Sequence, residues 1–314
     1  MRIPTPIAQV VRGFAMGSAD IVPGVSGGTV ALVLGIYDRL IRNISTGAHG
    51  LKQLLTGDVS GFAATMRRIE WIWLSALLGG ILLAIIALSS VIETLLHEQP
   101  VRMAALFFGL ILGSIWVALR MLDRVDGVSL ALMLGIGGTM FLLLGLRSDT
   151  EVAEGALEVV TEPWWVFFLA GAIAICAMIL PGISGSFILV MLGMYTEVLG
   201  AVNDRDLTVL LAFALGCVVG LATFSTLLNW LLEHYHRWVL AAMIGLMIGS
   251  TRVLWPWPNG TNTTTMSLPA DDVVVPILLA AVGAAVVVIV DLLAVRFVTV
   301  EPLHGHDTEV EPAR

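Results

Sequence analysis

Two short stretches of the chain combine proline, glycine and hydroxyl side chains in a pattern that suits anion binding. They read Pro-Gly-Val-Ser-Gly-Gly-Thr and Pro-Gly-Ile-Ser-Gly-Ser. Glycine lets the backbone approach a ligand closely, and a helix that begins after the turn presents free N–H groups and a positive dipole end. Hydroxyl groups add donors without charge. The residues predicted to bind a phosphate or carboxylate are Ser26, Gly27, Gly28, Thr29, Ser184, Gly185 and Ser186, with Pro23, Gly24, Pro181 and Gly182 forming the turns.

Asp20 is the acidic residue of the apolar arm before the first turn, and Met178 occupies the aligned position of the second copy. An ionisable group at membrane depth is costly and is therefore a functional candidate. Asp20 could carry a proton or bind a coupling cation such as sodium. It could equally pair with Arg12, or with a hydroxyl at the turn, and only fix the local structure.

A phosphate also calls for a basic partner. Four arginines lie near apolar segments, and the sequence does not choose among them, since each could instead anchor the chain at the membrane interface. We assign two of them, Arg12 and Arg252, to the predicted site. The four candidates are Arg12, Arg39, Arg102 and Arg252.

The two stretches are copies of one another. Residues 23–41 and 181–199 are identical at seven of nineteen aligned positions. A second match pairs Gly-Leu-Ile-Leu-Gly-Ser at 109–114 with Gly-Leu-Met-Ile-Gly-Ser at 245–250. The unit is much longer than a solenoid repeat, which indicates duplication of a half-protein.

The composition is that of an integral membrane protein. Apolar residues make up 58% of the chain, charged residues 13%, and the mean hydropathy is +0.94. Runs of the roughly 20 residues that a span requires predict transmembrane helices at 71–92, 101–119, 128–146, 207–232, 238–254 and 273–295. No signal peptide is evident, the two cysteines look like packing residues, and neither a metal site nor a nucleic-acid role has support.

The segments 7–41 and 164–199 each carry Pro-Gly near the middle, which disfavours an unbroken span. We predict two re-entrant helical hairpins. The cytoplasmic side, which includes the loop 42–70, then receives twelve of the sixteen Lys and Arg residues, as the positive-inside rule favours. The outer acidic loop covers 147–163, and both termini, with a polar tail at 298–314, are cytoplasmic.

One hairpin and three spans make an odd number of crossings, so the halves 1–146 and 164–297 are predicted to be inverted repeats in an all-α fold. The hairpins would then enter from opposite sides, and their tips could meet near the midplane. Inverted repeats with broken helices are typical of alternating-access transporters.

Enzyme functions fit the sequence poorly. Both tips contain Gly-x-Ser-Gly, which resembles the active serine of rhomboid proteases, but such a serine needs a base within hydrogen-bond reach. All six histidines fall in loops, span ends or the tail. The clustered Arg and His of a lipid-phosphate phosphatase are also missing, and His234 and His236 fit a solvated turn better than a metal pair.

The segments SADIVPGVSGGTVALVLGIYDRLI and ILPGISGSFILVMLGMYTEVLGAV resemble the signatures of the polyprenyl-phosphate transporter family of bacteria and archaea. The resemblance covers nearly the whole chain. It implies a flippase in the cytoplasmic membrane of a prokaryote that returns undecaprenyl phosphate from the outer to the cytoplasmic leaflet for peptidoglycan and other envelope synthesis. Its partners would be the polyprenyl-phosphate lipid, membrane lipid and possible further copies of the chain, without a cofactor.

Two other functions stay open from the residues alone. An ion-coupled carrier or channel for a small anion would use a path closed to the bilayer, whereas a lipid flippase needs a groove open to it. A scaffold for cell-wall enzymes would tolerate substitution of both tips.

Overall fold

The chain is described here as a computed structural model. Its described residues are 5–21, 26–145, 163–185, 188–189, 192–260, 263, 265–269 and 273–297, with the side chains of 5, 203 and 293–297 left aside. The regular structure of these ranges consists of eleven helices, which confirms the all-α prediction. Pro23, Gly24 and Ser186, the outer loop 147–162 and the tail 298–314 lie outside the described residues.

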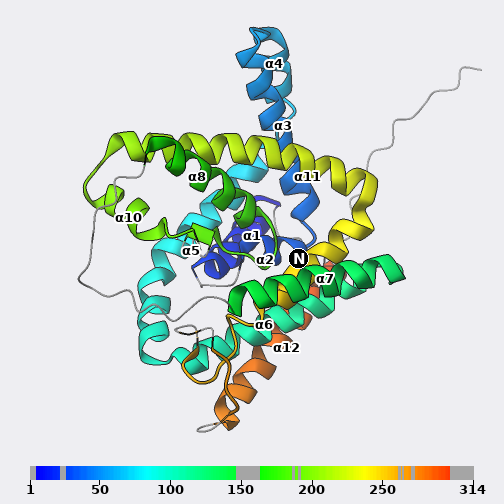
Figure 1. The fold of residues 1–314 in the computed structure, drawn as a ribbon. Helices are drawn as coiled ribbons and strands as arrows, with labels where there is room; N and C mark the ends of the chain where they lie inside the picture. The colour runs from blue at the N-terminus through cyan, green and yellow to red at the C-terminus, as the bar shows by residue number, and fades with distance from the viewer. Residues whose placement is uncertain are drawn as a thin grey trace, which may run out of the picture.

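The helices pack mainly as four pairs through small residues, and in each pair the two helices run in the same chain direction. In the first half, α1 (Thr5–Asp20) packs on α5 (Trp71–Glu98), and in the second half α8 (Trp164–Ile179) packs on the first arm of α11 (Leu207–Ser250). The other two pairs join the halves, because α6 (Pro100–Arg120) lies along α12 (Val274–Phe297) and α7 (Gly127–Gly145) lies along the second arm of α11. Figure 1 shows α1 and α2 at the centre of this arrangement.

The helix pairs of the two halves make close contacts at aligned glycines. A methyl group at Gly80 of α5 would collide with the carbonyl oxygen of Val10, and one at Gly216 of α11 would collide with that of Phe168, which aligns with Val10. Gly109 of α6 likewise meets the backbone of α12, and Gly245 meets that of α7. Small residues let membrane helices approach closely. Matched contacts of this kind are what a duplicated half-protein should show, although inversion across a membrane remains a prediction.

The turn that follows each tip is also repeated in detail. Gly35 and Gly193, which align, both have positive φ, at 66° and 68°. Such backbone favours glycine because it has no Cβ. Directly after these turns, α3 (Tyr37–Leu55) and α10 (Tyr195–Asn203) begin at the aligned tyrosines.

Each of the six predicted spans coincides largely with a helix, although the one predicted at 238–254 ends at Ser250, and two of the spans form one long helix. α11 has 44 residues, so it is about 66 Å long, roughly twice the thickness of a bilayer core. Its backbone leaves helical geometry at Tyr235 (φ −133°, ψ 31°), which divides it into two arms. Trp230 and Trp238 pack against Tyr235 at this joint. The polar residues 233–237 therefore form a joint within the helix, where a separate loop was expected.

Five helices of the described residues are long and apolar enough to cross a membrane, namely α5, α6, α7, α11 and α12. The chain is therefore a membrane protein. α8 is a shorter apolar helix of 16 residues.

The connection 42–70 is largely helical. α3 continues to Leu55, and α4 (Val59–Met66) folds back on it after a turn at Gly57. Asp58 caps α4 by accepting a hydrogen bond from the Gly61 N–H at 2.8 Å. Figure 1 shows α3 and α4 projecting from one end of the molecule.

Candidate anion-binding site

The first tip is built around the start of α2 (Gly27–Val33). Ser26 is the N-cap of this short helix and accepts a hydrogen bond from the Gly28 N–H at 3.1 Å. Asp20, the last residue of α1, accepts one from the Gly27 N–H at 2.6 Å. The carboxylate thus lies at the helix N-terminus, where the dipole favours a negative charge. Among the described residues, Asp20 is held by the backbone of Gly27 and not by Arg12 or a hydroxyl, the partners expected for it.

The two tips touch one another, as the duplicated hairpins were expected to allow. The Ser26 hydroxyl lies 3.4 Å from the carbonyl oxygens of both Met178 and Leu180. The Thr29 hydroxyl accepts a hydrogen bond from the Gly182 N–H at 3.0 Å. Ser26 and Thr29 are 1% and 2% exposed, so this tip junction excludes water.

Tyr37 and Gly28 complete the tip junction. The Tyr37 hydroxyl donates to the carbonyl oxygen of Ile179 at 3.1 Å. A methyl group at Gly28 would lie 2.7 Å from the same oxygen, so glycine is required there by the close approach of the second tip. Every one of these contacts joins residues more than 140 positions apart in the chain.

The second tip turns at Pro181 and Gly182. α8 ends at Ile179, and Gly182 has a φ of 87°. This is the helix break that the Pro-Gly pair predicts. A methyl group at Gly182 would collide with the backbone of Met247. Ser184 is half-buried and has polar contacts of its own, and Gly185 is buried beside the Ala174 carbonyl.

The structure therefore brings together Ser26, Gly28, Thr29 and the turn at Gly182, and it occupies their polar groups with one another. Their role in binding a phosphate stays a prediction. The two assigned arginines lie elsewhere. Arg252 covers Gly145 at the end of α7 and sits 4.9 Å above the Phe141 ring, while Arg12 lies two helical turns before Asp20 on α1.

Arg12 belongs to a second polar region, beside a cavity of about 430 Å³ between α1, α3 and α5. We call it the basic cavity. It is lined by Pro6, Gln9, Arg39, Ile69, Glu70, Trp71, Ile72 and Trp73. Arg12 donates to the Gln9 side-chain oxygen at 3.3 Å, and Gln9 is 2% exposed.

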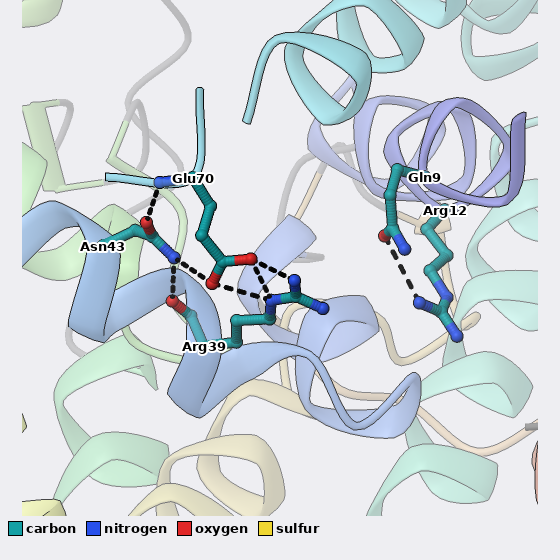
Figure 2. A network of polar contacts seen from close by, with 5 residues as sticks. All are labelled: Gln9, Arg12, Arg39, Asn43 and Glu70. Carbon is teal, nitrogen blue, oxygen red and sulfur yellow. Dashed lines mark hydrogen bonds and ion pairs between the residues drawn. The ribbon is translucent and has the colours of Figure 1, made fainter. Parts of the chain in front are cut away.

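Arg39 is held in the basic cavity by three neighbours. Its guanidinium forms an ion pair with Glu70, with Nε 3.0 and 3.1 Å from the two carboxylate oxygens, and lies 5.0 Å from the centre of the Trp73 ring. Asn43 supports the pair by donating to Glu70 and by accepting from the Glu70 N–H. Figure 2 shows the Arg39 guanidinium between Glu70 on one side and the Gln9–Arg12 pair on the other.

The charges of the basic cavity do not balance. Hydrogen bonds from Arg39 hold the pKa of the Glu70 carboxyl below its usual range, so Glu70 stays charged at neutral pH and neutralises one arginine. In the described part of the chain, Arg12 bonds to Gln9 and forms no ion pair. One positive charge is therefore left beside the cavity. Gln9, Glu70 and Trp73 were not predicted from the sequence to bind a ligand, and among the lining residues only Arg39 was considered as a partner for a phosphate.

No cluster of three or more His, Cys, Asp or Glu that could hold a metal occurs among the described residues. His236 instead lies 3.3 Å from Asp38 on an exposed surface.

A family model described as undecaprenyl phosphate translocase-like matches residues 16–270, which include both tips and the whole tip junction. The chain belongs to this family. The family assignment agrees with the resemblance carried by the two Pro-Gly-x-Ser-Gly signatures.

Two curated relatives share most of the chain. A polyprenyl-phosphate transporter of Vibrio cholerae is 42% identical over 252 residues, which is 80% of this chain and 78% of that protein. A polyprenyl-phosphate transporter of Staphylococcus aureus is 31% identical over 258 residues, or 79% of this chain and 86% of that protein. No solved structure matches the chain significantly.

Proposed function

We propose that this protein moves a polyprenyl phosphate across the membrane, as the names of its relatives suggest. The substrate would be undecaprenyl phosphate, which the protein returns from the outer to the cytoplasmic leaflet of the prokaryotic cytoplasmic membrane for reuse in envelope synthesis. The observation that carries the mechanism is the tip junction, since two duplicated helix breaks meet through buried hydroxyls and backbone groups. Broken helices that meet at a repeat interface are typical of transporter substrate sites.

In this proposal the two halves are inverted repeats with re-entrant hairpins, and both termini are cytoplasmic. The junction opens alternately to either side and exchanges its internal hydrogen bonds for bonds to the phosphate. Ser26, Thr29, Ser184, Ser186 and the neighbouring glycines would hold the headgroup, while the chain of the lipid stays in the bilayer. Because Asp20 is bound to the first tip, a proton or sodium ion that neutralises it would couple ion movement to opening.

The test is transbilayer movement of undecaprenyl phosphate in proteoliposomes. We expect movement with the wild-type protein and at least a tenfold loss with the Ser26→Ala/Ser184→Ala double variant, because each lost hydroxyl removes a hydrogen bond worth about 1 kcal/mol or more to a charged group. Ser114→Ala is the matched control, since among the described residues this buried serine donates to Leu110 within its own helix.

Full activity of the double variant would exclude the tips as the phosphate site. Absence of movement with the wild-type protein, beside an active reconstituted control, would instead favour a carrier for a small anion.

A further inference from the structure

The basic cavity lies beside the start of α5, at a distance from the tips. α5 begins at Trp71, whose indole donates to the carbonyl of Met66, the last residue of α4. Tryptophan at the end of a span is typical of the membrane–water interface. Gln9 precedes Asp20 by eleven residues on α1, so the cavity is about 16 Å along that helix from the first tip.

The polar side of the basic cavity offers donors that the described residues do not use. The Trp73 indole nitrogen is buried and has no hydrogen-bond acceptor among them, although Trp73 is only 5% exposed. A buried donor without a partner is costly. The adjacent Gln9 amide is also buried and oriented by Arg12.

The other side of the basic cavity is apolar and exposed. Trp71 and Ile72 line it and are 57% and 76% exposed. Exposed apolar groups beside a span face lipid, so a ligand with a hydrocarbon chain could place its head inside while the chain leaves sideways. A free inorganic anion would gain nothing from this side.

Glu70 behaves as an internal anion in this arrangement. It occupies the Arg39 guanidinium, yet both side chains are 41% exposed, and exposed ion pairs contribute only about 0.2–1 kcal/mol. A phosphate monoester carries about −1.5 to −2 charges and three acceptor oxygens. Such a group can displace a carboxylate from arginine, which binds phosphate in a bidentate manner.

We propose that the basic cavity is a second binding site for the substrate, where Arg39, the Gln9 amide and the Trp73 indole N–H bind the phosphate monoester of a lipid. Arg12 supplies the unbalanced positive charge. Glu70 takes the place of the ligand when the cavity is empty. The inference rests on the proposed function, from which it takes the identity of the substrate. It adds a headgroup site at the interface, from which the lipid enters or leaves the path to the tip junction.

The test measures equilibrium binding to the full-length protein in nanodiscs, with farnesyl phosphate, inorganic phosphate and farnesol as probes. Arg39→Gln should weaken the binding of farnesyl phosphate by roughly tenfold or more, because a charge-assisted bond is lost. Glu70→Gln should strengthen it by about threefold to tenfold, because the competing anion is removed. A gain of affinity cannot arise from misfolding, so the second variant protects the test if the first one is unstable.

Asp126→Asn is the matched control. Asp126 forms an ion pair of 2.8 Å with Arg237 that is similarly exposed but lies outside the basic cavity, and its loss should leave binding unchanged. Farnesyl phosphate should bind at least tenfold more tightly than inorganic phosphate or farnesol. Equal binding of the two phosphates would overturn the assignment to a lipid.

Wild-type affinity for farnesyl phosphate in both Arg39→Gln and Glu70→Gln would overturn the site itself. If those variants bind normally while the wild-type protein moves undecaprenyl phosphate, this inference fails and the proposed function stands. If binding depends on Arg39 but no movement occurs, the proposed function fails and the anion site stands.

Discussion

Ser26 and Thr29 are two of the side chains through which the first tip contacts the second. Both are hydroxyl residues at the start of a seven-residue helix, and both face backbone groups of residues 178–182. A junction made of hydrogen bonds between small polar groups can open without exposing a large apolar surface. That property suits a contact that forms and breaks in the proposed transport cycle.

Thr29→Val should weaken the tip junction. Valine keeps the shape but leaves the Gly182 N–H buried without its acceptor, which costs about 1–3 kcal/mol. We expect a lower thermal unfolding temperature in detergent. Thr226→Val is the control, because that exposed hydroxyl donates to Ala222 of its own helix in the part of the chain that the structure describes. An unfolding temperature for Thr29→Val equal to that of the control would mean that the Thr29–Gly182 bond does not hold the tips together.

At the scale of helices, close contact through glycine is what pairs the elements. Gly80 and Gly216 take the same place in the two halves, each against a backbone carbonyl of the arm that precedes its tip. These pairs fix α1 and α8, and hence the two tips. The tip geometry therefore depends on residues far from the site.

Gly80→Ala should destabilise the α1–α5 pair, because the added methyl group would collide with the Val10 carbonyl. Overpacking of this kind costs about 1–3 kcal/mol. Gly79→Ala is a control one residue away, since that position is open, and alanine there should stabilise the helix slightly. The thermal unfolding temperature and the transport rate should both fall for Gly80→Ala and not for Gly79→Ala. Equal behaviour of the two variants would contradict the role of glycine in this contact.

The helices and their breaks could be predicted from the sequence, whereas the basic cavity could not. Apolar runs and Pro-Gly pairs are local signals, and they correctly located six helical segments and the break at Pro181. Glu70 meets Arg39 only because α5 starts beside α3, 31 residues later in the chain. The joint at Tyr235 was missed because residues 233–237 are polar enough to read as a loop, yet aromatic packing keeps them next to helical arms.

For the whole molecule, the main consequence of the duplication is that the last helix of each half packs on a helix of the other half. α6 of the first half lies along α12 of the second, and α7 lies along α11. Each half therefore depends on the other for its packing, and the two tips meet in the space between them (Figure 1). Movement of one half relative to the other would change both of these pairs and the tip junction together.

If the two halves are inverted as proposed, two matching connections lie on opposite sides of the membrane. They are the connection after the first predicted hairpin and the connection after the second. Ser60 lies in the former, on α4, and Asp204 in the latter, directly after α10; both are exposed. In a background without Cys176 and Cys217, single cysteines from Ser60→Cys and Asp204→Cys should react differently with a membrane-impermeant maleimide. In intact cells Asp204→Cys should be labelled and Ser60→Cys protected, and permeabilised cells should show labelling of both. Labelling of the two from the same side would mean that the halves are parallel, and the alternating opening of the tips to the two faces would then lose its structural basis.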